Sequence, residues 1–284
     1  MHADNLTVGI VGLGLIGGSI AKAFRENTTY RVLGYDKSEK VLSSAVFCSA
    51  VEESLEGKLA ECDILIVALY PKDTVEFIKN HAGEFKPGTI VTDTSGVKSF
   101  VCEELFKLSE EGGFYFIGGH PMAGIERSGF EYSRPDLFKD ASLILTPYKS
   151  TPKEKTDLLW HVLRRLGFSY LELTTPKEHD KMIAFTSQLA HIVSSAYVMS
   201  PSALNHFGFS AGSFKDMTRV ARLNEYMWTE LFLENASCLS LELDGLIKRL
   251  LEFDEALKTG DKKHLFELLK KGREQKEESD LLGG

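Results

Sequence analysis

The stretch LTVGIVGLGLIG, residues 6–17, joins an apolar run to a glycine-rich turn. The run Leu6–Val11 has the near-continuous apolar character of a parallel strand that is covered on both faces. Gly12, Gly14 and Gly17 then form a GxGxxG motif that opens a helix candidate. In such a motif the glycines allow a tight turn, close approach of the backbone to a pyrophosphate, and close packing of helix on strand. We therefore predict a dinucleotide site; a glycine-rich turn without a ligand is the alternative.

An acidic residue follows the second strand candidate at the spacing that this motif requires. Asp36 lies 19 positions after Gly17, where a carboxylate accepts hydrogen bonds from the adenosine ribose of NAD and repels the 2′-phosphate of NADP. The neighbouring Lys37 is a cation that could tolerate NADP, and an ordinary turn or cap aspartate is the alternative reading. We favour NAD, with cofactor contacts from Gly12, Gly14, Leu15, Ile16, Gly17 and Asp36.

Short apolar runs alternate with helix-like segments through the first half of the chain. This alternation predicts a doubly wound parallel sheet of the Rossmann type. The strand candidates are Leu6–Val11, Arg31–Tyr35, Asp63–Leu69, Thr89–Thr92, Phe114–Ile117 and Ser142–Leu145, and the helix candidates between them include Gly17–Arg25, Lys72–His81 and Lys98–Ser109.

The second half of the chain changes to helical periodicity. Ser169–Leu173 is a candidate for the last strand, and Pro176 follows it. Beyond this point apolar residues recur at i, i+4, i+7, i+8 and i+11, as in Leu239, Leu243, Leu246, Ile247 and Leu250. We predict a dinucleotide-binding domain over 1–174 and an all-helical domain over 175–284. Residues 270–284 are highly charged, and we expect them to be frayed or solvated.

Composition argues against several classes of protein. The 284 residues carry a formal net charge of −8, which does not suit a general nucleic-acid binder. The four cysteines form no CxxC pair, as expected for a reducing compartment without a disulfide framework or zinc site. No apolar stretch reaches the roughly 20 residues that span a bilayer, and no basic segment precedes the first apolar run. We expect a soluble cytoplasmic protein without a metal centre.

Two loops at the expected cofactor edge of the sheet carry candidates for chemistry. His120 lies in GGHPMAG, residues 118–124, directly after the strand candidate Phe114–Ile117. A histidine with a pKa of about 6.5 can accept a proton from an alcohol near neutral pH, although a histidine that only supports the backbone is an equal alternative. The second loop, TDTSGVK over residues 92–98, contains Ser95.

The helical half offers further polar candidates. Gln188 and His191 are three residues apart and share a helix face, where they could line a cavity or form a satisfied polar pair in the core. Arg219 could bind a carboxylate through its planar guanidinium, or else form an ordinary surface ion pair. From the residues alone, Trp228 is better interpreted as core packing than as a site residue.

Taken together, several of these stretches resemble the prephenate dehydrogenase family of tyrosine biosynthesis. The similarity extends over nearly the whole chain, and its glycine motif is the least specific part. It rests on GLGLIGGSIAKAF, VTDTSGVK, GGHPMAGIERSGFEYS, LFKDASLILTP, MIAFTSQLAHIVSSAYV and SFKDMTRVARLNEYMWTELFLEN.

The resemblance implies an NAD-binding Rossmann domain, a helical domain that dimerises, and oxidative decarboxylation of prephenate to 4-hydroxyphenylpyruvate. It implies that His120 takes the proton of the ring hydroxyl as hydride leaves to NAD, and that His191 and Arg219 hold the substrate carboxylates. Gln188 and Trp228 are further candidates for the substrate site. Arogenate dehydrogenase and a non-catalytic NAD sensor are the alternative functions.

One loop departs from the pattern of the family. The family usually has Asp-x-x-Ser-Val-Lys there, with the serine hydroxyl in contact with the substrate hydroxyl. This chain has Gly96 at the serine position and a serine one residue earlier, at Ser95. We take Ser95 as the candidate for that hydroxyl contact.

Overall fold

The computed structural model describes residues 5–125 and 127–282. The chain divides into two compact units, Met1–Asn235 and Ala236–Gly284. The first unit therefore continues beyond the predicted dinucleotide-binding domain, 1–174, into the helical half of the sequence. Among the described residues, no helix combines the length and the apolar character needed to cross a membrane.

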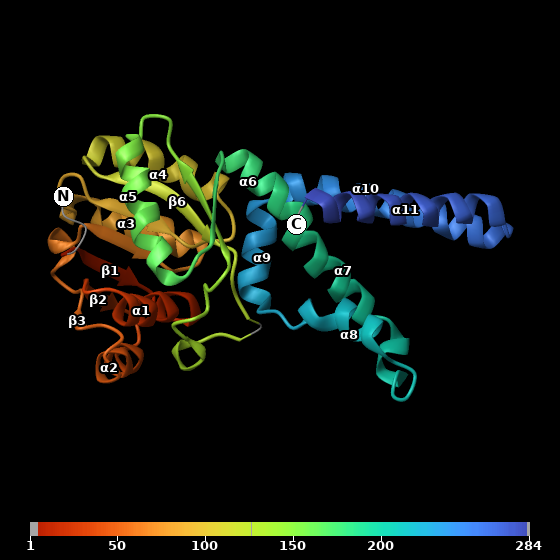
Figure 1. The fold of residues 1–284 in the computed structure, drawn as a ribbon, viewed down its shortest axis with the longest axis horizontal. Helices are drawn as coiled ribbons and strands as arrows, with labels where there is room; N and C mark the ends of the chain where they lie inside the picture. The colour runs from red at the N-terminus through yellow and green to blue at the C-terminus, as the bar shows by residue number, and fades with distance from the viewer. Residues whose placement is uncertain (1–4, 126, 283–284) are drawn as a thin grey trace. The chain divides into compact units, whose positions relative to one another are not determined.

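An eight-stranded sheet forms the centre of the first unit, in the order β3-β2-β1-β4-β5-β6-β7-β8 (Figure 1). The part of this order that runs 3-2-1-4-5-6 is typical of dinucleotide-binding folds, in which the ligand crevice lies at the carboxyl ends of β1 and β4. The strands are β1 (Thr7–Val11), β2 (Arg31–Tyr35), β3 (Glu53–Ser54), β4 (Ile64–Val67), β5 (Ile90–Asp93), β6 (Tyr115–Pro121), β7 (Ser142–Pro147) and β8 (Tyr170–Leu173). The predicted Rossmann-type sheet is confirmed, with the short strand β3 as an addition.

One pair of strands departs from the expected all-parallel arrangement. The strand β7 runs antiparallel to β6, with Ile144 opposite His120, while the other neighbouring pairs are parallel. A parallel return needs a crossover, usually a helix, but between β6 and β7 the described residues contain only the short 3-10 helix η3 (Phe130–Tyr132). The chain therefore comes back along β6 in the opposite direction.

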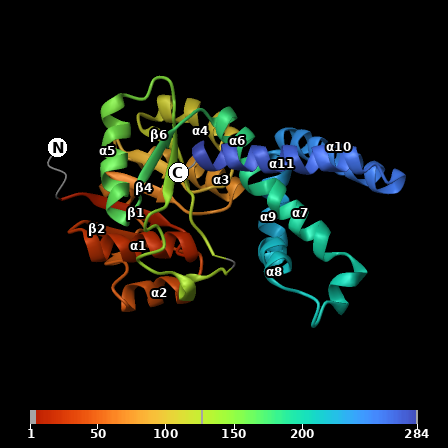
Figure 2. The same ribbon diagram turned by 45° about the vertical axis from the view of Figure 1, so that its right-hand side comes forward.

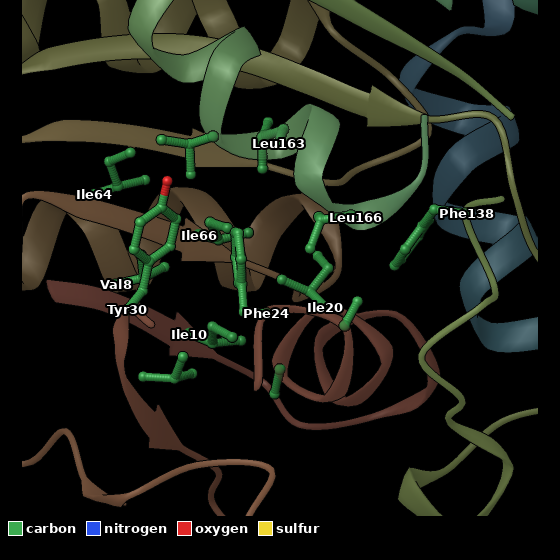
Figure 3. Packing of buried hydrophobic residues seen from close by; sticks show 14 of the residues in the cluster. Val8, Ile10, Ile20, Phe24, Tyr30, Ile64, Ile66, Phe138, Leu163 and Leu166 are labelled. Atoms are coloured by element: carbon green, nitrogen blue, oxygen red, sulfur yellow. The ribbon is translucent and has the colours of Figure 1, made fainter. Parts of the chain in front are cut away.

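Helices cover both faces of the sheet. On one face, Val8 and Ile10 of β1 and Ile66 of β4 pack with Phe24 of α1 and Leu163 of α5 (Figure 3). On the other face, apolar residues of α3 and α4 pack against β1, β4 and β5. The helices of this part of the chain are α1 (Leu15–Asn27), α2 (Glu39–Phe47), α3 (Pro71–His81), α4 (Ser99–Gly112) and α5 (Lys153–Leu163), with the 3-10 turns η1 (Leu59–Glu61), η2 (Ala82–Glu84) and η4 (Arg164–Leu166).

The elements described after β8 are all helices, as predicted from about residue 175. Within the first unit, a π-helical turn, η5 (Ala184–Gln188), joins α6 to α7. The remaining elements of this unit are α6 (Pro176–Ile183), α7 (Leu189–Val198), α8 (Gly212–Thr218) and α9 (Glu225–Glu234), with the 3-10 turns η6 (Pro201–Asn205) and η7 (Arg219–Ala221).

The second unit consists of α10 (Ala236–Thr259) and α11 (Lys262–Leu282), which run beside each other in Figures 1 and 2. The predicted apolar stripe lies on α10, where Leu239 is buried but Leu250 is 57% exposed. Of the two expectations for the charged tail, the solvated one holds within the described residues, because α11 continues to Leu282 as an exposed helix. Pairs four residues apart, such as Arg273–Glu277 and Lys276–Asp280, bridge successive turns of this exposed helix.

Candidate active site

The glycine motif forms a tight turn between β1 and α1. Gly12 has a φ of +85°, a conformation that side chains rarely adopt, and its N–H donates to the Tyr35 carbonyl at 2.8 Å. A Cβ at Gly17 would lie 1.8 Å from the Gly12 carbonyl oxygen, so helix and strand approach too closely for any larger residue. A Cβ at Gly14 would meet no protein atom within 4 Å. Two glycines thus shape the turn, and the third leaves space beside it.

That space adjoins the start of α1. Gly14 is the N-cap of the helix and provides no side-chain hydrogen bond, so the first-turn N–H groups have no cap from the motif itself. Leu15 and Ile16 begin the helix and are partly exposed, whereas Gly17 is buried. Free N–H groups together with the helix dipole make such an end favourable for a pyrophosphate.

Asp36 closes the other side of the turn. Its Oδ2 accepts from the Leu13 N–H and its Oδ1 from the Ser38 N–H, both at 2.9 Å. These bonds fix the carboxylate at the carboxyl end of β2, and each oxygen keeps a further acceptor position. The arrangement fits the ribose hydroxyls of a dinucleotide, and it also includes the turn contact that the alternative reading of Asp36 describes.

His120 lies near the end of β6, at the same edge of the sheet as the glycine turn. Its Nδ1 is 2.8 Å from His179 Nε2, and His179 Nδ1 is 2.8 Å from Asp180 Oδ1. A Cβ built on Gly96 would lie 4.0 Å from His120 Nε2, so this ring atom faces the 92–98 loop. The histidine is partly exposed, and its inner nitrogen is engaged by protein.

Burial keeps both imidazoles neutral. It lowers the pKa of His120 well below the ordinary value, and the neighbouring His179 and Lys98 act in the same direction. Burial likewise lowers the pKa of His179, although the bond to Asp180 opposes this. For Asp180 itself, burial opposes ionisation, but hydrogen bonds from His179, Lys98 and Ser99 outweigh it and hold the pKa below the usual value. His120 is therefore ready to accept a proton at neutral pH.

Asp93 connects the 92–98 loop to the strand that carries His120. Its Oδ2 accepts from the Ser95 N–H at 2.9 Å and from Lys98 Nζ, and its Oδ1 accepts from the Gly119 N–H at 2.9 Å. The Lys98 and Asp93 side chains are both fully buried, so each charge depends on the other. One carboxylate thus fixes the loop and the residue before His120.

The Ser95 hydroxyl is buried and has no hydrogen-bond partner among the described residues. An unsatisfied buried hydroxyl costs free energy of roughly 1–3 kcal/mol, which a ligand group can recover. This observation fits the predicted role of Ser95, which stays a prediction.

Gln188 belongs to a buried amide cluster. Its Nε2 donates to the Leu231 carbonyl at 3.0 Å, and its Oε1 accepts from Asn235 Nδ2 at 2.7 Å. Asn235 Nδ2 also donates to the Asp180 carbonyl at 2.8 Å. With 1% exposure, Gln188 joins α9 to the π-helical turn, which favours the alternative reading of a satisfied polar pair in the core.

The structure brings His191, Trp228 and the Arg219 segment together. The His191 ring lies 3.8 Å from the Trp228 ring, centroid to centroid, and its Nδ1 donates to the Val220 carbonyl at 3.0 Å. Arg219 begins the 3-10 turn that provides this carbonyl. Contacts with substrate by these three residues stay predictions.

The sequence did not single out Asp93, Lys98, His179, Asp180 or Asn235. The only signal in the sequence was the adjacent pair His179 and Asp180 near the start of a helix. Such a pair is also found on exposed helix surfaces, so it did not by itself mark a site. Their burial arises only when α6 packs beside α4 and β7.

Two family models match the chain consecutively. Residues 20–171 match the nucleotide-binding domain of prephenate dehydrogenase, and residues 175–271 match its dimerization domain. The chain belongs to the prephenate dehydrogenase family. This confirms the predicted family, the oxidoreductase class and the order of a Rossmann-like part followed by a helical part.

Other members of this family are similar over most of their length. Prephenate dehydrogenase of Lactococcus lactis is 31% identical over 282 residues, which cover 94% of this chain and 77% of the relative. The crystal structure of prephenate dehydrogenase from Aquifex aeolicus with hydroxyphenyl propionate and NAD+ has a TM-score of 0.85 and 31% identity, covering 96% of this chain and 98% of that one. The structure of Synechocystis arogenate dehydrogenase has a TM-score of 0.82 and 26% identity, covering 96% and 100%. Members named for prephenate and for arogenate are thus both similar to this chain.

Proposed function

We propose that the protein catalyses the NAD-dependent oxidative decarboxylation of prephenate to 4-hydroxyphenylpyruvate, a step of tyrosine biosynthesis. The observation that carries this proposal is His120, a neutral imidazole whose Nε2 faces the 92–98 loop at the dinucleotide edge of the sheet. Membership of the family and the similarity to an NAD+ complex support the choice of substrate and cofactor.

The cofactor site fits NAD through features of this chain. Gly14 leaves room for the pyrophosphate at the α1 N-terminus, where Leu15 and Ile16 begin the helix, and Asp36 offers acceptors for the ribose hydroxyls. A fixed carboxylate would repel the 2′-phosphate of NADP. When bound, NAD supplies the hydride acceptor.

The residues of this chain provide the acid–base chemistry and the orientation of the substrate. His120 Nε2 accepts the proton of the ring hydroxyl while hydride leaves the carbon that bears this hydroxyl. The Ser95 hydroxyl forms a hydrogen bond with the same hydroxyl oxygen. Arg219 and His191 hold the carboxylates of the substrate. Loss of carbon dioxide from the resulting ketone forms an aromatic phenol, which makes the reaction effectively irreversible.

The domain division and the assembly are part of the proposal. We assign cofactor binding to residues 1–174, and substrate binding and dimerisation to residues 175–284, a division supported by the limits of the two family matches. The match to a dimerization domain supports a homodimer. The cytoplasmic location expected from the cysteine pattern stays a prediction.

The test combines two cofactors with two substrates. Purified protein is given NAD or NADP with prephenate or arogenate, and the absorbance of reduced cofactor is followed. We expect turnover with NAD and prephenate. Faster turnover of arogenate would favour the second candidate, for which the similarity to arogenate dehydrogenase is the supporting observation. Binding of NAD without turnover of either acid would contradict both and favour a sensor.

A further inference from the structure

The hydrogen-bonded series His120–His179–Asp180 has only one consistent arrangement of hydrogens at neutral pH. An ionised carboxylate only accepts hydrogen bonds, so His179 Nδ1 carries the hydrogen of its 2.8 Å contact with Asp180. Because His179 is neutral, its Nε2 is then an acceptor, and His120 Nδ1 carries the hydrogen of the second 2.8 Å contact. His120 Nε2 is therefore left with a lone pair and no hydrogen. The two inner residues dictate the tautomer in which His120 can act as a base.

Burial strengthens this dependence. The side chains of His179 and Asp180 are 0% and 3% exposed, so water does not compete for their hydrogen bonds. Asp180 is fixed from the other side by the Lys98 N–H at 2.7 Å and the Ser99 N–H at 2.8 Å. These contacts leave the carboxylate no freedom to turn away from the imidazole.

The carboxylate of Asp180 favours a positive imidazole at His179 once a proton arrives there. Asp93 and Lys98 form a buried pair whose formal charges cancel. Asp180 is bonded to two backbone N–H groups and a neutral ring, so it adds one negative charge that no side-chain cation balances among these contacts. An imidazolium at His179 would lie directly against this charge.

We propose that His179 and Asp180 are positioning residues that act through His120, by fixing its tautomer and by taking up the proton it receives. The proposal rests on the proposed function for the origin of that proton. As the substrate O–H bond breaks, a new N–H bond forms at His120 Nε2. The hydrogen on His120 Nδ1 then moves to His179 Nε2, so His120 is again neutral and the imidazolium at His179 is paired with Asp180. After hydride transfer and loss of carbon dioxide the same steps run backwards, and His120 Nε2 returns the proton to the phenolate oxygen of the product, so no net proton is released.

A plain capping role for Asp180 accounts for less of this geometry. The two bonds from Lys98 and Ser99 cap the N-terminus of α4, whose own N-cap residue provides no side-chain bond. That cap would not require a fully buried histidine between the carboxylate and His120. The experiment must therefore separate helix stability from the state of His120.

The first measurement uses protein without cofactor or substrate. Nitrogen-15 NMR of ring-labelled histidines reports the tautomer of His120 in the wild type, His179→Gln and His179→Phe. We expect the Nδ1–H tautomer in the wild type and in His179→Gln, because the glutamine amide oxygen can still accept from His120. In His179→Phe that acceptor is lost and the tautomer becomes mixed. An unchanged tautomer in His179→Phe would overturn the positioning role, whatever the substrate of the enzyme proves to be.

The second measurement uses kcat and its pH dependence. We expect His179→Gln to lower kcat roughly tenfold, and His179→Phe and Asp180→Asn to lower it roughly 10²–10⁴-fold, with smaller changes in KM. Removing the Asp180 charge should also move the acid limb of the kcat–pH profile to lower pH, because the positive imidazole loses its counter-charge. The other charges beside the two histidines, Asp93 and Lys98, are unchanged in this variant. Glu178→Gln, an exposed neighbour on α6, is the matched control and should behave as the wild type.

The outcomes are distinguishable. Melting temperatures of all variants show whether a loss of kcat only reflects unfolding. If Asp180→Asn is folded and has normal kcat and an unmoved acid limb, the proposal is overturned. If His179→Gln is folded and has the same kcat as the wild type, His179 does not take up the proton. Failure of the wild type to turn over either acid would contradict the proposed function and leave the NMR result to decide the positioning role.

Discussion

At the scale of single residues, His120 is the side chain on which the chemistry depends. The change His120→Asn keeps a polar side chain of similar width but removes the nitrogen that accepts the proton. We expect kcat to fall roughly 10²–10⁴-fold, the range associated with a positioned general base. The affinity for NAD, measured by titration calorimetry, should change little. A near-normal kcat would exclude His120 as the base.

Arg219 provides the second prediction at this scale. Arg219→Ala removes a guanidinium that we assign to a substrate carboxylate, and a lost charge-assisted bond costs about 1.5–3 kcal/mol. We expect kcat/KM to fall roughly 10–100-fold, mainly through KM. Arg165→Ala, which removes the same charge from an exposed position after α5, is the control. If steady-state rates give an unchanged kcat/KM for Arg219→Ala, the assignment is wrong.

Sequence patterns identified His120 but not the residues that control it. Its loop context, two glycines and a proline at a strand end, is local and visible in the sequence. His179 is 59 positions away from His120, and only the packing of α6 beside α4 brings the two rings together. For Gln188, helical spacing left a cavity-lining residue and a satisfied polar pair both open, and the bonds of its amide with Leu231 and Asn235 match the second of these.

At the scale of secondary-structure elements, the turn from β1 to α1 separates the needs of the fold from those of the ligand. Gly17→Ala would place a Cβ 1.8 Å from the Gly12 carbonyl oxygen, and we expect a loss of stability of about 2 kcal/mol or more. Gly14→Ala meets no protein atom, so the protein should stay within about 1 kcal/mol of wild-type stability. Its methyl group would occupy space needed by the pyrophosphate, and Kd for NAD should rise roughly tenfold or more. Thermal melting and NAD titration of the two variants test this contrast, and wild-type affinity in Gly14→Ala would contradict it.

The elements also show where sequence patterns are informative. Continuous apolar runs located most strands, because burial on both faces leaves a strong local signal, and Arg31–Tyr35 has the predicted limits. Strand direction has no such signal, so the antiparallel β7 was not expected. The two-residue β3 is too short to show a pattern, and the π-helical turn at Ala184–Gln188 bonds to α9 through residues 43 positions apart in the sequence.

For the protein as a whole, His120 and His179 link stability to pH. Their pKa values in the folded protein lie below the ordinary 6.5, so the unfolded chain binds more protons as pH falls through 6.5. Stability is therefore full above this pH and decreases below it, by at most about 1.4 kcal/mol per pH unit for each histidine. Denaturant unfolding at pH 7.5 and 5.5 measures the loss, which should be smaller in His179→Gln. Equal losses would show that His179 is not kept neutral by the fold.

The assembly gives the last prediction. A homodimer should have twice the chain mass of 31.6 kDa in light scattering. Exposed leucines on α10 are candidates for the contact, and an aspartate there would have to bury a charge, so Leu250→Asp should shift the protein towards monomer. A monomeric wild type at micromolar concentration would contradict the proposal. The leucines that are more than half exposed on this helix are Leu241, Leu250, Leu251 and Leu257.

The carboxylate of Asp180 also limits how the chain can be recombined. A chimera joined at 174/175 would take the glycine turn (residues 12–17) and the His120 loop (residues 118–124) from one parent, but Asp180 from the other parent. The Lys98 and Ser99 N–H groups, at the start of α4, would then depend on a foreign helix for their acceptor. Exchange of domains within this family should therefore succeed only between parents whose helix after this junction places a carboxylate within hydrogen-bond distance of these two N–H groups.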